Sequence, residues 1–171
     1  MILIQDSREQ SPLTFPVVKG VEVATKMLAV GDYGAIHGVG GRGVYDPAVV
    51  ERKSLGDLFA SFSGGYEAEK AKLQKAKTMG ITYILAIEAP FLEVLKGHAF
   101  WKDGEVHESR KSGLAQIRQL MTWQRKYGVQ VVYCESRRSM AVWILEYFLS
   151  FERITQDAAG DGESLADGGG H

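Results

Sequence analysis

The chain has 171 residues, of which 45% are hydrophobic, with a formal net charge of −1 and a single cysteine, Cys134. This length and composition predict one folded domain with a sizeable core, and they exclude a disordered chain, a strongly basic binding domain and a disulfide-stabilised fold. No apolar run approaches the ~20 residues that cross a bilayer, and the N-terminus shows no secretory signal, so we expect a cytoplasmic protein.

Hydrophobic patterning predicts short strands in the first third of the chain. They cover residues 2–5, 21–28, 33–36 and 49–53. The second strand would carry its apolar face on Val21, Val23, Thr25 and Met27. The glycine-rich segment 37–43, which holds His37, lacks the Gly-Lys-Ser/Thr ending of a phosphate-binding loop, so we interpret it as a hairpin turn.

Helices and strands alternate in the rest of the chain. Helices are predicted from Ser54 to the Gly64-Gly65 pair and over residues 66–79, 90–96, 114–127 and 136–153, with strands at 81–88 and 129–134 and a long polar loop at 97–113. This alternation predicts a three-layer α/β domain over residues 1–154, with a central mixed sheet flanked by helices. Residues 155–171 are rich in Gly, Asp and Ala, so we expect a disordered acidic tail.

Three charged residues stand on neighbouring predicted strands. Asp32 follows Gly31, and Glu51 and Lys53 share one face of the strand at 49–53. Two carboxylates can hold Mg²⁺ or Mn²⁺, and an ammonium group can steady an attacking water or the charge on a phosphate. This set suits metal-dependent phosphodiester cleavage; the alternatives are a turn aspartate and an edge-strand charge pair.

Three motifs stand in a fixed order. They are Asp6-Ser7-Arg8-Glu9, Gly31-Asp32-Tyr33 and Glu51-Arg52-Lys53-Ser54-Leu55-Gly56-Asp57. The series resembles the XPF-type nuclease domain, or ERCC4 domain, of the PD-(D/E)XK superfamily, whose pattern is D-x-R-E, G-D-Y and E-R-K-x-x-x-D. The resemblance covers residues 1–153 and implies a restriction-endonuclease-like fold. The chain departs from the family at Gly64-Gly65-Tyr66, where the family has Gly-Arg-Phe, and at Glu69, where a Gln is usual.

The resemblance implies a metal-dependent DNA endonuclease. Asp32 and Glu51 would ligate Mg²⁺ or Mn²⁺, and Lys53 would orient the attacking water. Asp6 would ligate a second metal or hold a water of the metal, unless it is an ordinary acid of a surface loop.

Four further charged residues are expected to support this site. Arg8 and Glu9 would form an ion pair, or Arg8 would contact a phosphate. Arg52 points away from Glu51 and would pair with an acid such as Asp57, which could instead orient Lys53.

Charge is unevenly distributed along the chain. All 20 Lys and Arg precede residue 154, whereas four of the 21 acids lie in the tail, so the body carries about +3. This modest positive charge is compatible with DNA binding. The candidate DNA contacts are Trp101, Lys102, Arg110 and Lys111 in the polar loop, and Arg137 and Arg138 at the start of the last helix. The four histidines show no zinc-ligand spacing.

The expected partner is branched DNA. Relatives commonly carry a helix-hairpin-helix module after the nuclease domain, for which this chain has no room, so a homodimer or a partner protein would assist branch recognition. Self-association is predicted from the large apolar residues of the last two helices, Trp123, Trp143, Ile144, Tyr147, Phe148 and Phe151. Two alternatives stay open: a catalytically inactive DNA-binding or scaffold subunit, and a nuclease of plain duplex or single-stranded ends. The setting would be cytoplasmic, nucleoid-associated or viral in a host cell.

Overall fold

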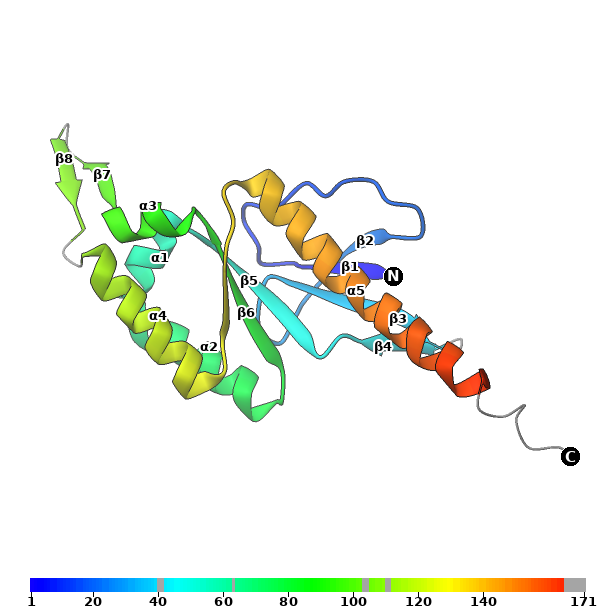
Figure 1. Ribbon diagram of the computed structural model, residues 1–171. Helices are drawn as coiled ribbons and strands as arrows, with labels where there is room; N and C mark the ends of the chain where they lie inside the picture. Colours follow the sequence, from blue (N-terminus) through cyan, green and yellow to red (C-terminus); the bar gives the residue numbers. More distant parts are fainter. Residues whose placement is uncertain (40–41, 63, 103–104, 110–111, 165–171) are drawn as a thin grey trace, which may run out of the picture.

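The computed structural model describes residues 1–171 apart from 40–41, 63, 103–104, 110–111 and 165–171. Its strands form one seven-stranded sheet and a separate two-stranded hairpin at one end of the molecule (Figure 1). Within the described residues no helix is both long and apolar enough to span a membrane.

The main sheet is mixed, with strand order β2-β1-β3-β5-β6-β9 and β4 paired to β3. Its strands are β1 (Ile2–Asp6), β2 (Glu22–Lys26), β3 (Tyr33–Val39), β4 (Arg42–Tyr45), β5 (Ala48–Ser54), β6 (Thr82–Glu88) and β9 (Gln130–Tyr133). β3 is antiparallel to β1, β4 and β5, whereas β1 is parallel to β2 and β6 is parallel to β5 and β9. The pairing of β3 with β4 confirms the predicted hairpin around the glycine-rich segment.

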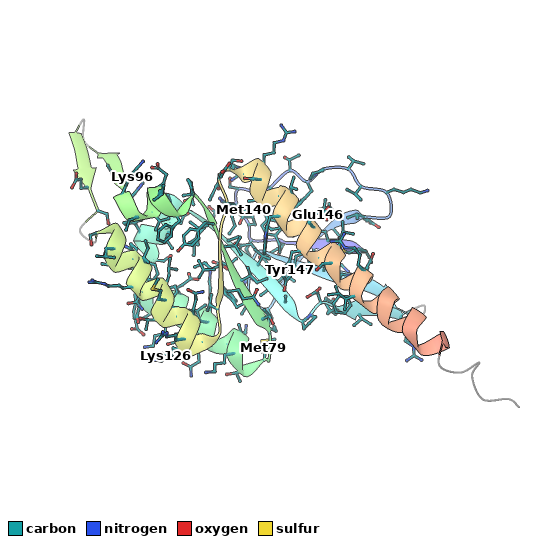
Figure 2. All side chains as sticks on the ribbon, viewed as in Figure 1. Met79, Lys96, Lys126, Met140, Glu146 and Tyr147 are labelled. Carbon is teal, nitrogen blue, oxygen red and sulfur yellow. The ribbon has the colours of Figure 1, made fainter. Side chains whose placement is uncertain are left out.

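Helices cover both faces of this sheet (Figure 1). One face carries α1 (Leu55–Ser61), α2 (Tyr66–Thr78), α3 (Phe91–Lys96) and α4 (Gly113–Tyr127), and the other carries α5 (Arg137–Ser164). On α5, Met140 is fully buried against the sheet and Glu146 is exposed (Figure 2). The predicted three-layer α/β fold is confirmed.

Strand β5 lies between the two layers and serves both. Val49 packs in the core under α1, α2 and α4, whereas Val50 packs in the core under α5. The next residues continue this alternation, so Glu51 and Lys53 face the first layer and Arg52 faces the other. The start of α1 follows directly, because the Ser54 side chain accepts a hydrogen bond from the Asp57 amide, as the capping pattern predicts.

Two boundaries differ from the sequence-based expectation. The segment 97–113 is not a loop throughout, because β7 (Ala99–Lys102) and β8 (Glu105–Glu108) form an antiparallel hairpin within it. Helix α5 extends to Ser164, beyond the predicted helix end at residue 153, while the disordered tail stays a prediction. The polar sequence of the hairpin and the glycines near the end of α5 lack the regular apolar spacing from which strands and helices are predicted.

Two predicted environments are also wrong. His37 does not lie in a turn but on β3, fully buried, with its Nε2 2.9 Å from Asp46 Oδ2. The apolar face expected for the strand at 21–28 does not enter the core, because Val23 on β2 and Met27, which follows β2, are 49% and 76% exposed. β2 is an edge strand of the sheet and has β1 as its neighbour on one side.

The aromatic residues that suggested self-association are largely core residues. Trp123, Ile144 and Phe148 are at most 1% exposed. Trp143 and Tyr147 are partly buried and stack on each other, with ring centroids 5.2 Å apart. The argument for a dimer from excess apolar surface on α4 and α5 therefore loses most of its support.

Replacing one of these buried rings should be costly. Trp123 packs against Phe62 at 4.4 Å between ring centroids, so Trp123→Ala should lower the free energy of unfolding by roughly 3–5 kcal/mol. Trp143→Ala, at a partly buried position, serves as the matched control and should lose less than half as much. Urea unfolding measures both, and equal losses would contradict this assignment of the core.

Candidate active site

The three predicted site residues meet where the start of β3 pairs with β5. The Asp32 amide donates to the Val50 carbonyl at 2.8 Å, and the Arg52 amide donates to Asp32 Oδ2 at 2.8 Å. Gly31 precedes this contact with φ +79°, and a Cβ there would lie only 3.0 Å from Val49 Cβ. Glycine is required at this position because both the backbone conformation and the space exclude a side chain.

Glu51, Lys53 and Glu69 are buried charges that form one network with the partly exposed Lys72. Lys53 Nζ lies 3.1 Å from Glu51 Oε1 and 2.8 Å from Glu69 Oε2 on α2. Lys72, one turn along α2, places its Nζ 2.6 Å from Glu51 Oε1. The Tyr83 hydroxyl donates to Glu69 Oε1 at 3.4 Å. Charges buried this far are tolerated because each has an opposite partner.

Two adjoining pockets open above these side chains. One of about 450 Å³ is lined by Asp6, Arg8, Asp32, Glu51 and Lys72 among others. The other, of about 540 Å³, shares Arg8, Asp32, Glu51 and Lys72 and adds Glu9, Gln10, Ser11, Lys53 and Glu69. Together we call them the catalytic cleft.

The pKa values of Asp32 and Glu51 are shifted in opposite directions. Burial and then the charge of Glu51 raise the pKa of Asp32 to about 7. Burial also acts to raise the pKa of Glu51, but Lys53 and Lys72 outweigh it and hold that pKa below its ordinary value. Asp32 is therefore the acid whose charge lacks compensation.

This donor set fits a hard divalent cation. Asp32 and Glu51 offer carboxylate oxygens, and Mg²⁺ is commonly bound by one or two carboxylates while it keeps several waters. A cation between them would offset the burial and the repulsion from Glu51 that raise the pKa of Asp32 to about 7. Within the described residues no group of three or more His, Cys, Asp or Glu forms a complete protein cage, so water or substrate would fill the remaining positions.

Asp6 has a different environment from the one predicted. Its Oδ1 accepts from Arg8 Nε at 2.7 Å and its Oδ2 accepts from the Leu28 amide at 2.6 Å. Both oxygens are engaged, so Asp6 holds Arg8 at the cleft and braces the chain before Asp32. Arg8 consequently pairs with Asp6 and not with Glu9.

Arg52 reaches the opposite face of the sheet, as the strand period predicts. Its partners are Glu88, at 2.8 Å, and Glu9, at 3.6 Å, rather than the predicted Asp57. Asp57 lies in the first turn of α1 and accepts from the hydroxyl of the N-cap Ser54 at 2.6 Å, and Lys53 is oriented by Glu69 instead. Both acids that pair with Arg52 lie far from it in sequence, so the prediction of the nearby Asp57 as its partner is wrong.

The predicted DNA contacts are placed unequally. Arg137 and Arg138 begin α5, on the face of the sheet opposite Glu51. Trp101 and Lys102 lie on β7. This strand is at the end of the molecule opposite the C-terminal end of α5 (Figure 1). Arg110 and Lys111 lie outside the described residues.

Four residues of the site were missed or undervalued. Glu69 was noted only as a departure from the usual Gln, and Lys72, Tyr83 and Glu88 were not singled out. The spacing of Glu69 and Lys72, three apart on a helix after the Glu-x-Lys strand, was the available signal, because such residues share one helix face.

Comparison with known proteins identifies the family. The sequence profile described as the ERCC4 domain matches residues 5–147. XPF from Aeropyrum pernix is 21% identical, with a TM-score of 0.60 over 100% of this chain and 75% of that one. A structure described as XPF from Aeropyrum pernix in complex with DNA gives the same identity and TM-score over 89% of this chain and 66% of that one. No curated protein sequence matches. The predicted resemblance is confirmed: the chain belongs to the ERCC4 domain family.

Proposed function

We propose that this protein is a metal-dependent endonuclease that hydrolyses phosphodiester bonds in DNA. The observation that carries the proposal is Lys53, held between Glu51 and Glu69 beside the uncompensated acid Asp32 in an open cleft. Membership of the ERCC4 domain family and the DNA complex of the XPF structure support it. Mg²⁺ or Mn²⁺ is the proposed cofactor, bound by Asp32 and Glu51.

The residues of the cleft would divide the work. When bound, the cation supplies a Lewis acid that stabilises charge on the phosphate. Lys53, oriented by Glu69 and Tyr83, donates a hydrogen bond to the attacking water or to a phosphate oxygen. Without the cation, Lys72 neutralises Glu51. With a cation on Glu51, Lys72 would turn to the DNA backbone, and its side chain is 44% exposed and therefore has room to move. Arg8, fixed by Asp6, contacts a neighbouring phosphate.

The proposed substrate is branched DNA, such as a fork or flap. A body charge of about +3 gives few contacts for tight binding along a uniform duplex. A junction offers unpaired bases and a deformable backbone, so a small protein can select it with fewer contacts. A homodimer or a partner protein would extend this surface. The chief alternative, an inactive scaffold subunit, is disfavoured because Asp32, Glu51 and Lys53 stand together in the cleft.

Cleavage should depend on the two acids and the cation. Asp32→Asn and Glu51→Gln should each lower the cleavage rate at least ~100-fold in Mg²⁺, and EDTA should abolish it. Glu93→Gln, on the surface of α3, is the matched control and should cleave at the normal rate. Gel assays of a labelled fork measure the rates. Full activity in EDTA, or in both acid variants, would refute the proposal.

Neutralising the two acids should change stability in opposite directions. The raised pKa of Asp32 means that the unfolded chain loses this proton near pH 4 while the folded chain keeps it until about pH 7, so the cost to folding grows over that interval and is complete above it. Asp32→Asn should therefore raise Tm at pH 8 but not at pH 4, without metal. Glu51, with a lowered pKa, stabilises the fold above its ordinary pKa, so Glu51→Gln should lower Tm at pH 8. Differential scanning calorimetry tests this; the same sign for both variants would contradict it.

The substrate preference should appear in a panel of DNA structures. At matched salt, fork and flap substrates should be cleaved at least ~5-fold faster than blunt duplex, because junctions supply the deformable backbone. Blunt duplex and single-stranded oligonucleotide of equal length are the controls. Equal rates on all of them would favour the alternative of a nuclease for plain duplex or single-stranded ends.

A further inference from the structure

A second pocket lies on the α5 side of the sheet, outside the catalytic cleft. It has a volume of about 460 Å³ and is lined by Thr14, Phe15, Pro16, Arg137 and Arg138. We call it the Phe15 pocket. None of its residues lines the catalytic cleft, and it combines an aromatic ring with two guanidinium groups.

The walls of this pocket are held in place. Arg137 Nη2 donates to the Ser11 and Pro12 carbonyls at 2.9 Å each, and its Nη1 lies 3.6 Å from Glu88. Phe15 packs edge-on against Tyr33 with ring centroids 5.4 Å apart. The Leu13 amide donates to the Tyr33 hydroxyl at 2.9 Å and ties the same segment to β3. Such fixed groups bind a ligand with little loss of conformational entropy.

Arg138 differs from Arg137 because its charge is available to a ligand. Its side chain is exposed, and the ion pairs of the described residues do not include it. The helix amides are not the binding groups here, since Ser136 and Ser139 cap each other's amides at 3.0 and 3.2 Å. The pocket therefore offers guanidinium donors for a phosphate beside a ring for a planar base.

The Phe15 pocket is continuous with the catalytic cleft along the chain. Glu9, Gln10 and Ser11 line the cleft, and Thr14, Phe15 and Pro16 line the pocket. The three residue steps from Ser11 to Thr14 span at most about 11 Å. Arg137 joins the two by its bonds to Ser11 and Pro12. One DNA strand could thus occupy both.

We propose that the Phe15 pocket binds an unpaired nucleotide of the DNA strand that enters the catalytic cleft. The base stacks on Phe15, and Arg138 holds its phosphate, while Arg137 fixes the wall of the pocket. A paired base would have to leave its stack to enter, so the pocket favours single-stranded or junction DNA over duplex. This inference deepens the proposed function and rests on it for the identity of the ligand as DNA.

The test measures binding without cleavage. Fluorescence anisotropy in EDTA compares a labelled fork, a single-stranded oligonucleotide and a blunt duplex. Arg138→Ala should weaken fork and single-strand binding at least ~5-fold, because a charge-assisted contact to the phosphate is lost, and change duplex binding less than ~2-fold. Arg125→Ala, an exposed arginine on α4, is the matched control and should change none of them.

Phe15→Leu separates stacking from charge. With 2-aminopurine in the unpaired arm, wild type and Arg138→Ala at saturating DNA should quench its fluorescence, and Phe15→Leu should not. A circular dichroism melt confirms that Phe15→Leu remains folded; if it does not, the Arg138→Ala result decides.

Two results would overturn the inference: unchanged fork binding in Arg138→Ala, or an equal loss on fork and duplex, which indicates a general electrostatic surface. Cleavage by the wild type in Mg²⁺ is scored separately. Normal cleavage with unchanged fork binding defeats this inference alone, whereas selective loss of fork binding in a protein that never cleaves defeats the proposed function alone.

Discussion

The structure depends on one buried ammonium group, Lys53, shared between Glu51 and Glu69. Burying three charges beside the core is tolerated only when each is paired, so α2 must dock where Glu69 reaches β5. Lys72 adds a second cation to Glu51. Burial and the neighbouring Glu51 raise the pKa of Asp32 to about 7 even though Lys72 also attracts this carboxylate. The network that stabilises the fold is therefore also the one that the proposed catalysis would use, and it leaves Asp32 as the acid that a cation would compensate.

Strand β5 also connects the two faces of the molecule. Glu51 and Lys53 face the cleft, whereas Arg52 between them reaches Glu9 and Glu88. Glu88 also lies 3.6 Å from Arg137, and Arg137 holds the loop whose other end lines the Phe15 pocket. An ionic chain thus runs from the catalytic strand to the start of α5. This series of ion pairs keeps the loop at residues 9–16 in one position relative to both pockets.

Much of the fold followed from hydrophobic period, because β5 and β6 alternate between two cores and the helices each bury one face. The order of the motifs predicted that Asp32 and Glu51 lie close together. Gly31 makes this possible, because its positive φ and its close approach to Val49 bring Asp32 against β5. Partners distant in sequence could not be predicted this way: Arg52 pairs with Glu88 and Glu9, and Lys72 reaches Glu51 only because α2 folds back over β5. The polar β7–β8 hairpin and the glycine-containing end of α5 lack the apolar period on which such predictions depend.

The most direct test of the account is anomalous diffraction from crystals soaked in Mn²⁺. We predict one peak within coordination distance, about 2.0–2.3 Å, of oxygens from both Asp32 and Glu51. The Lys72 ammonium should have left Glu51 Oε1, which it now contacts at 2.6 Å, while Lys53 should remain on Glu69. A fully occupied peak elsewhere, or none at saturating Mn²⁺ with Lys72 still on Glu51, would contradict the claim that this pair of acids is the metal site.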